Sequence, residues 1–200
     1  MEFTVKIMQI HYYIISLLTE ERLPIIEYNI KKLPQFITYK AVNGYDIEET
    51  VKALKESGLI YRNLVTPTYG ALANFLSKFN LLKVQIEKNL EYMCFIEDDL
   101  KILEGFEEHV IKYCNMLRNN RNLTQIRLDT WGEGYITSVE GAKRIVAQLE
   151  KDGIIRNIDD QLRVYCKPEY HVKDTPWELV VPTNKGDCLK TEKINTDLFI

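Results

Sequence analysis

The stretch YMCFIEDD, residues 92–99, decides the fold, because apolar and aromatic residues run directly into three acids. An apolar run of this length is typical of a strand that is buried on both faces. The acids that follow it, Glu97, Asp98 and Asp99, predict that the strand ends at an open site. Side chains alternate along a strand, so we expect Glu97 and Asp99 on one face and Asp98 on the other.

Three adjacent carboxylates also predict a chemistry. Two ionised carboxylates about 6 Å apart, at an effective dielectric constant near 20, repel each other by roughly 3 kcal/mol. A divalent cation, a raised pKa or exposure to water would relieve that repulsion. Hard oxygen ligands suit Mg²⁺ or Mn²⁺, so we favour a cation site with Asp99 as first ligand and Glu97 or Asp98 beside it. A solvated acidic turn is the alternative.

Length and composition indicate the number of domains, the class of partner and the location of the protein. The 200 residues are 46% hydrophobic, which predicts a single domain, 1–200, with a core at about 11–165 and a C-terminal extension at 166–200. A net charge of −3 gives no electrostatic case for nucleic acid. No apolar run reaches membrane length, and no transmembrane segment is expected. Four cysteines without a CxxC pair predict reduced thiols and a cytoplasmic location.

The first half of the chain alternates strands and helices. We predict strands at 12–18, 35–42 and 91–97, and helices at 24–32, 47–57 and 66–88. Asp46 and Glu49 form a capping-box pattern, Gly58 ends that helix, and Thr66 followed by Pro67 starts the longest one. This order predicts an α/β fold with a mostly parallel, Rossmann-like sheet and helices on its faces. Ligands of such sheets bind beyond the carboxyl ends of the strands.

The second half continues with further strands and helices. We predict helices at 106–117, 139–151 and 157–165, with Ser138 and Asn157 as caps of the last two, and strands at 123–128, 134–138 and 177–181. Trp131 and Tyr135 are candidates for stacking against a sugar, although core packing explains Tyr135 equally well.

Five stretches, in order, resemble family 25 of the glycosyltransferases, which contains bacterial lipooligosaccharide galactosyltransferases and procollagen galactosyltransferase domains. The opening strand 12–17 is similar, and 36–44, ending in Ala-Val-Asn-Gly, resembles the family's Ala-Val-Asp-Gly segment. Residues 69–76 resemble its helix start, Gly-Cys-x-Leu-Ser-His. Residues 89–99 are very close to its acidic strand. Residues 134–146, followed by the acidic pair at 159–160, resemble its Tyr-x-Ser-x-x-Gly-Ala region.

The resemblance implies a GT-A-like, Mn²⁺- or Mg²⁺-dependent enzyme of glycan or lipopolysaccharide biosynthesis. Such an enzyme moves a hexose, galactose first, from a UDP-sugar to a glycan or protein hydroxyl and inverts the anomeric centre. A metal ion would neutralise the diphosphate leaving group. The candidate metal ligands are then Asp99, Glu97 and His171, and the candidate general base is Asp159 or Asp160. Candidates for nucleotide-sugar binding are Asn74 and Asp98, together with Ser16, Arg22 and Asn43, which follow the first two predicted strands. Helix capping is the alternative for Asp159 and Asp160.

The chain departs from the family pattern at three positions. Asn74 and Ala73 stand where the helix-start motif has histidine and serine, and Asn43 stands where the family has aspartate. These departures motivate a second hypothesis, a catalytically silent relative that binds sugar nucleotides or acts in assembly. A phosphoryl-transfer or hydrolase site has less support, because no GxxxxGK[ST] phosphate-binding loop is present.

Overall fold

The computed structural model describes residues 8–62, 68–128, 132–165, 180–182 and 192–194. The helices and strands follow in the order β1 (Ile10–Ser16), α1 (Leu23–Lys32), β2 (Phe36–Lys40), α2 (Ile47–Ser57), α3 (Tyr69–Glu87), β3 (Tyr92–Glu97), β4 (Leu100–Ile102), α4 (Phe106–Asn119), β5 (Gln125–Arg127), β6 (Gly134–Ser138), α5 (Val139–Asp152), α6 (Ile158–Tyr165) and β7 (Val180–Pro182).

The central sheet has five strands in the order β2-β1-β3-β6-β5. β1 pairs in parallel with both β2 and β3, whereas β6 runs antiparallel to β3 and β5. The α/β class with helices on the faces is confirmed, but the sheet is mixed. β6 runs antiparallel to β5, because only residues 128–133 separate the two strands, and parallel strands need a crossover of a dozen or more residues.

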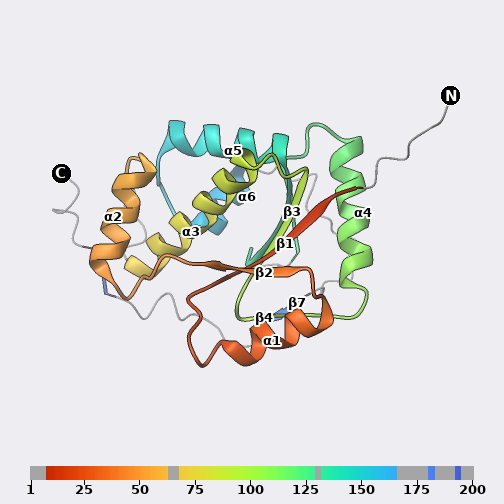
Figure 1. Cartoon of the computed structure of the whole chain (residues 1–200). Helices are drawn as coiled ribbons and strands as arrows, with labels where there is room; N and C mark the ends of the chain where they lie inside the picture. The colour runs from red at the N-terminus through yellow and green to blue at the C-terminus, as the bar shows by residue number, and fades with distance from the viewer. Residues whose placement is uncertain (1–7, 63–67, 129–131, 166–179, 183–191, 195–200) are drawn as a thin grey trace.

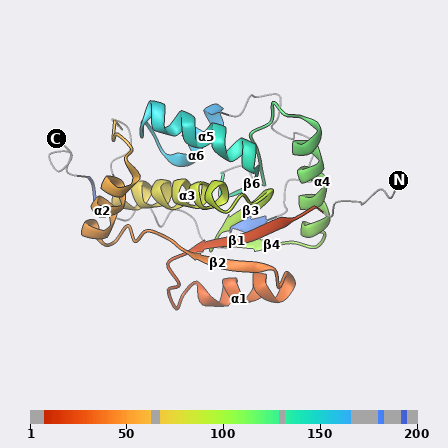
Figure 2. The same ribbon diagram turned by 45° about the horizontal axis from the view of Figure 1, so that its top comes forward.

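Strand alternation produces an apolar cluster on each face of the sheet. In β3, Met93 and Phe95 pack with α3, α5 and α6, while Cys94 and Ile96 pack with α1 and α4 on the other side. Figures 1 and 2 show α3, α5 and α6 on one side of the sheet and α1 on the opposite side. The buried strand predicted at residues 91–97 is therefore confirmed, and it lies in the centre of the sheet.

Three predicted helix ends are confirmed, two by a side-chain hydrogen bond and one by its backbone conformation. The side chain of Asp46 accepts from the Glu49 N–H at 2.9 Å, and that of Ser138 accepts from Gly141 at 3.1 Å. Gly58 ends α2 in the left-handed region, with φ of 71°. The capping box itself is not completed, because the Asp46 N–H already donates to a carbonyl, that of Asn43, and the Glu49 carboxylate accepts from the Asn43 N–H.

Of two other predicted caps, Thr68 takes the place of Thr66 before α3, and Asn157 occupies the cap position of α6 without a side-chain hydrogen bond. Helix α3 begins at Tyr69, and the Thr68 hydroxyl caps it by accepting from the Ala71 N–H, whereas the predicted start at Thr66 and Pro67 lies outside the described residues. Asn157 precedes α6 and its carbonyl accepts from Gln161, but its side-chain oxygen has no hydrogen-bond partner in the described part of the chain. Either threonine before α3 has the right chemistry for a cap, so sequence does not choose between them.

A second, two-stranded sheet follows the acidic stretch directly. β4 pairs with β7, whose position overlaps the strand predicted at 177–181. The fully buried Asn29 side chain of α1 donates to the Leu100 carbonyl at 2.7 Å and accepts from the Ile102 N–H at 3.0 Å. This amide satisfies two backbone groups that the second sheet leaves unpaired, and it fixes the chain immediately after the three acids.

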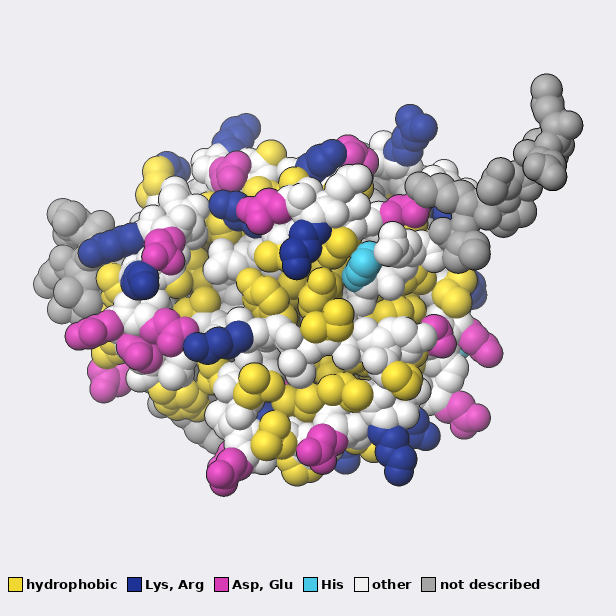
Figure 3. Space-filling model, in the orientation of Figure 1, with side chains coloured by type: hydrophobic (Ala, Val, Ile, Leu, Met, Phe, Trp, Pro, Cys, Tyr) yellow, Lys and Arg dark blue, Asp and Glu magenta, His cyan; other side chains and the backbone are white. Residues whose placement is uncertain are grey.

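The outer surface adds two observations. Figure 3 shows apolar side chains across the middle of one face and charged side chains of both signs around it. Ile37, on the edge strand β2, is 55% exposed. None of the described helices has both the length and the apolar character that are needed to cross a membrane.

Gly141 lies where α5 touches the chain that leads into β5, and it allows no side chain. A Cβ atom there would lie 1.9 Å from the Thr124 carbonyl oxygen. We expect Gly141→Ala to lower the free energy of unfolding by roughly 1–3 kcal/mol, because backbone atoms must move apart. Urea unfolding measures the loss. Lys143→Ala, at an exposed position of the same helix, is the control and should change stability by less than about 0.5 kcal/mol; equal effects would contradict the prediction.

Candidate functional site

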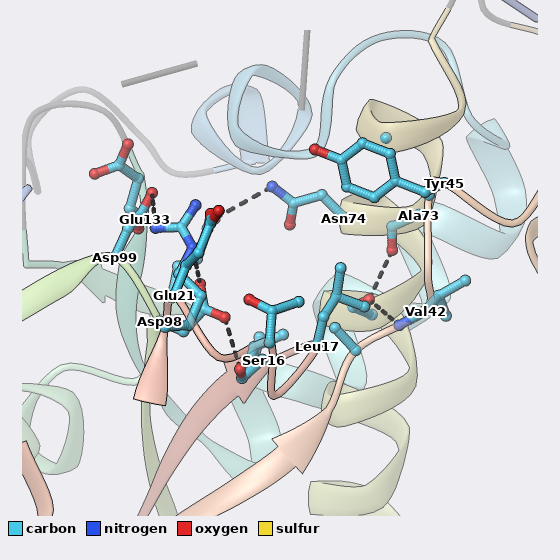
Figure 4. Close-up of a pocket in the computed structure, with 18 of the residues that line it drawn as sticks. Ser16, Leu17, Glu21, Val42, Tyr45, Ala73, Asn74, Asp98, Asp99 and Glu133 are labelled. Atoms are coloured by element: carbon cyan, nitrogen blue, oxygen red, sulfur yellow. Dashed lines mark hydrogen bonds and ion pairs between the residues drawn. The ribbon is translucent and has the colours of Figure 1, made fainter. Parts of the chain in front are cut away.

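A cavity of about 550 Å³ opens beyond the carboxyl ends of β1, β2 and β3. The chain leaves β1 through α1 to reach β2, and it crosses back through α2 and α3 to place β3 on the other side of β1. The boundary between β1 and β3 is therefore the switch point at which ligands bind in open α/β sheets. Figure 4 shows Asp98, Asp99 and Glu21 on one side of the cavity and Tyr45, Ala73 and Asn74 on the other.

The three acids after β3 all line this one cavity. The expected alternation of faces does not continue beyond Glu97, because β3 ends there and Asp98 and Asp99 form a turn. Asp98 accepts a 2.6 Å hydrogen bond from the Ser16 hydroxyl, which itself accepts from the Leu18 N–H. The predicted neighbours after β1 and β3 are thus in direct contact.

Arg22 is the cation among the described residues that line the cavity. Its guanidinium lies 3.7 Å from Asp98 and 3.6 Å from Asp99, with side chains that are 13–15% exposed. Burial raises the pKa of the Asp98 carboxyl, although the hydrogen bond from Ser16 and the charge of Arg22 oppose the rise. Arg22 therefore offsets part of the negative charge at the strand end.

Asp99 carries the largest unrelieved electrostatic cost at this edge of the sheet. Burial raises its pKa to about 7, the neighbouring Glu97 charge adds to the rise, and Arg22 opposes it. A carboxyl whose charged form is disfavoured in this way marks a candidate functional group. The repulsion that the sequence predicts among these acids is therefore present in the folded protein.

Glu97 faces α3 and contacts two of its side chains. The Asn74 amide donates to the Glu97 carboxylate at 3.2 Å, and the Lys78 ammonium lies 2.6 Å from the same oxygen. Positions four apart on a helix lie one above the other on the same face, which explains why Asn74 and Lys78 meet one carboxylate. Asn74, at a departure from the family pattern, thus contacts the acidic strand directly.

Lys78 also connects Glu97 to the predicted base. Its ammonium lies 2.6 Å from Asp159 and donates to the Gly132 carbonyl at 3.0 Å, and it sits 5.6 Å from the centre of the Tyr135 ring. Burial alone would lower the pKa of Lys78, but the carboxylates of Asp159 and Glu97 raise it well above its ordinary value. Lys78 is therefore a buried, charged ammonium between two carboxylates.

The remaining predicted residues fall in different places. Asp160 is half exposed and pairs with Arg163 on the outer side of α6, away from Lys78. Asn43 forms the turn after β2, where its side chain accepts from the Tyr45 N–H at 3.0 Å. Tyr135 is fully buried, so the suggestion that it stacks against a sugar is wrong. His171 and Trp131 lie outside the described residues.

Sequence reasoning missed Lys78, Glu133 and Tyr45. Glu133 lines the cavity, and its carbonyl accepts from the Glu97 N–H at 2.9 Å. Tyr45 also lines the cavity and is 65% exposed. The sequence did hold one signal for Lys78. Apolar residues occur on nearly all sides of α3, and a lysine buried inside such a helix needs a charged partner.

The donor atoms of the cavity fit a divalent cation whose shell the substrate completes. Six carboxylates line the cavity with Arg22, those of Glu20, Glu21, Glu97, Asp98, Asp99 and Glu133. Within the described residues, no three His, Cys, Asp or Glu side chains converge into a complete metal cage. Mg²⁺ is commonly held by one or two carboxylates together with substrate phosphates, which matches Asp99 and Asp98.

The protein is of the α/β class, with a mixed sheet and an acid-lined cavity at its switch point as the candidate ligand site. The sequence matches the family described as glycosyltransferase family 25 (LPS biosynthesis protein) over residues 9–152. The chain therefore belongs to glycosyltransferase family 25, which confirms the resemblance of the five stretches. Family membership supports glycosyl transfer as the general class of activity. The match ends at residue 152, so it does not include Asp159.

Two further proteins are similar to this chain. A Glycosyltransferase 25 family member from Drosophila melanogaster is 23% identical in an alignment 112 residues long, which covers 44% of this chain and 18% of that protein. The chain thus spans less than a fifth of the length of that relative. A solved structure, of a glycosyltransferase involved in the glycosylation of the major capsid of PBCV-1, matches 81% of this chain and 78% of its own at 9% identity and a TM-score of 0.41.

Proposed function

We propose that this protein transfers a hexose, galactose first, from a UDP-sugar to a glycan or protein hydroxyl, with inversion and with Mn²⁺ or Mg²⁺ as cofactor. The observation that carries the proposal is the acidic end of β3 inside a ligand-sized cavity, in a chain that belongs to glycosyltransferase family 25. A cavity of this volume suits a small-molecule ligand.

The charge of the cavity supports the need for a cation. A UDP-sugar carries its negative charge on the diphosphate. The cavity is itself lined by more carboxylates than the single guanidinium of Arg22 can neutralise, so a bound cation would reduce the repulsion. Asp99 and Asp98 would hold the metal ion, which when bound supplies Lewis-acid neutralisation of the leaving diphosphate. Arg22 lies between these two carboxylates and would contact the phosphates, while Ser16 keeps Asp98 oriented.

Inversion in a single displacement needs one general base for the acceptor hydroxyl. Asp159 is our candidate, because its side chain is 27% exposed and therefore accessible, and the Lys78 ammonium contacts its carboxyl oxygen at 2.6 Å. Asp160 has the same chemistry but points outward to Arg163. Adjacent residues of a helix lie about 100° apart, so only one of the pair faces Lys78.

Release of UDP from UDP-galactose tests the proposal. The purified chain is incubated with the donor, with and without Mn²⁺, and free UDP is measured in parallel with UDP-glucose as a second donor. We expect release that depends on Mn²⁺ and stops when EDTA is added. Calorimetry with UDP and Mn²⁺ then separates the alternatives. Binding without release would indicate a silent sugar-nucleotide-binding relative, and no binding at millimolar UDP would contradict both proposals.

Tyr45 offers a platform for the nucleobase at the rim of the cavity. Its ring is 65% exposed and lies across the cavity from Asp99 (Figure 4). Stacking of a base on an aromatic side chain contributes about 1–3 kcal/mol, so Tyr45→Ala should weaken UDP binding by roughly tenfold or more. Tyr45→Phe retains the ring and should bind UDP like the wild type. Equal affinities of the alanine and phenylalanine variants in calorimetry would rule out stacking.

A further inference from the structure

Lys78 joins parts of the site that come from separate regions of the chain. Its fully buried ammonium contacts Glu97 at the end of β3, the Gly132 carbonyl before β6, and Asp159 in α6. The two carboxylate contacts are both 2.6 Å long. Lys78 is therefore the common partner of a residue that lines the cavity and of the candidate base.

Stability alone does not explain a lysine at this position. The neighbours of Lys78 along α3, Ser77 and Phe79, are also buried, so the helix lies within the core. Uncharged side chains of similar volume in place of the whole cluster of Lys78, Glu97 and Asp159 would pack there without the cost of removing these charges from water. A charged Lys78 has a purpose if the positions of Glu97 and Asp159 matter, because its one ammonium holds the two carboxylates at a fixed separation.

The exposed fractions assign different roles to the three side chains. Lys78 is 0% exposed and cannot meet a substrate, whereas Glu97 and Asp159 are 21% and 27% exposed. Any effect of Lys78 on the reaction must therefore pass through these carboxylates.

We propose that Lys78 is a positioning residue for glycosyl transfer, whose buried ammonium holds the Asp159 side chain at a fixed distance from Glu97 at the donor cavity. This inference rests on the proposed function, with Asp159 as the proton acceptor. Misplacement of a reacting group by about 1 Å can slow a reaction about 100-fold, so a residue that only orients the base has a measurable effect.

A kinetic double-mutant cycle tests the inference. The wild type, Lys78→Met, Asp159→Asn and the double variant are compared for UDP release from UDP-galactose with Mn²⁺. We expect Lys78→Met to lower kcat by about 10- to 100-fold while the KM for the donor changes by less than about threefold. The double variant should be no slower than Asp159→Asn alone, because Lys78 then has no base to orient.

Three outcomes would overturn the inference. Losses that multiply in the double variant would mean that Lys78 acts independently of Asp159. A higher donor KM at unchanged kcat would assign Lys78 to donor binding, and a lower melting temperature with unchanged kcat would assign it to structure alone. If Lys78→Met does not fold, Lys78→Gln replaces it, because glutamine removes the charge and keeps an N–H donor.

Two controls separate this inference from the proposed function. Lys83→Met makes the same substitution in the same helix, at a position outside the cavity lining, and should leave kcat unchanged. If the wild type releases no UDP, the proposed function fails whatever Lys78 does. If the wild type is active and the losses multiply, only the inference about Lys78 fails.

Discussion

Asp99→Asn is expected to lower UDP release by at least about 100-fold, which is the scale of losing one preorganised electrostatic group. Asparagine keeps the size of the side chain and removes the charge that a divalent cation needs. The remaining activity should respond to Mn²⁺ only at higher metal concentration. Titration of activity with Mn²⁺, for the wild type and the variant, measures both effects. Glu140→Gln, which removes an exposed carboxylate on α5, is the matched control.

The same substitution should stabilise the metal-free protein. The pKa of Asp99 is raised to about 7, chiefly by burial and then by Glu97, so the folded state binds a proton more tightly than the unfolded state. The ionised form therefore costs stability above pH 7, and that cost disappears as pH falls towards the ordinary carboxyl pKa of about 4. Asparagine has no such cost at any pH.

Urea unfolding in the presence of EDTA, at pH 8 and at pH 5, measures this difference. We expect Asp99→Asn to be more stable than the wild type at pH 8, with a smaller advantage at pH 5. A gain in stability together with a loss of activity is the signature of a group retained for function. A variant that is less stable at pH 8 and fully active would identify Asp99 as a structural acid of the turn instead.

The predicted fold succeeds where local chemistry is sufficient. The buried strand before the acids, the caps at Asp46 and Ser138 and the helix end at Gly58 each depend on residues within a few positions of one another. The direction of β6 is different, because an alternating pattern at 134–138 is the same for a parallel and an antiparallel strand. The direction follows instead from the short connection between β5 and β6, which the pattern within the strand does not carry.

In the candidate site, too, some contacts could be predicted from the sequence and others could not. Ser16, Arg22 and the acids after β3 could be predicted to meet, because the carboxyl ends of neighbouring parallel strands lie at one edge of the sheet. Lys78 meets Asp159 across 81 positions of the sequence, and no local pattern encodes that contact. Asp159 and Asp160 are chemically equivalent in the sequence, and only the packing of α6 against α3 distinguishes them.

Lys78→Met is expected to lower the free energy of unfolding by about 3–5 kcal/mol, the largest loss of stability that we predict. Methionine fills a similar volume, so the loss comes from charge rather than from a cavity. Without the ammonium, the carboxylates of Glu97 and Asp159 remain largely buried and repel each other. Urea unfolding at pH 7, in the absence of metal and donor, measures the loss.

A triple variant shows whether the loss is electrostatic. Adding Glu97→Gln and Asp159→Asn to Lys78→Met removes the two charges that the single variant leaves without their partner. Replacing a whole buried ion cluster is often neutral, whereas removing one member is costly, so the triple variant should regain most of the lost stability. A triple variant as unstable as Lys78→Met would show that the methionine side chain does not fit α3. The loss of stability would then come from packing around the side chain and not from the missing charge.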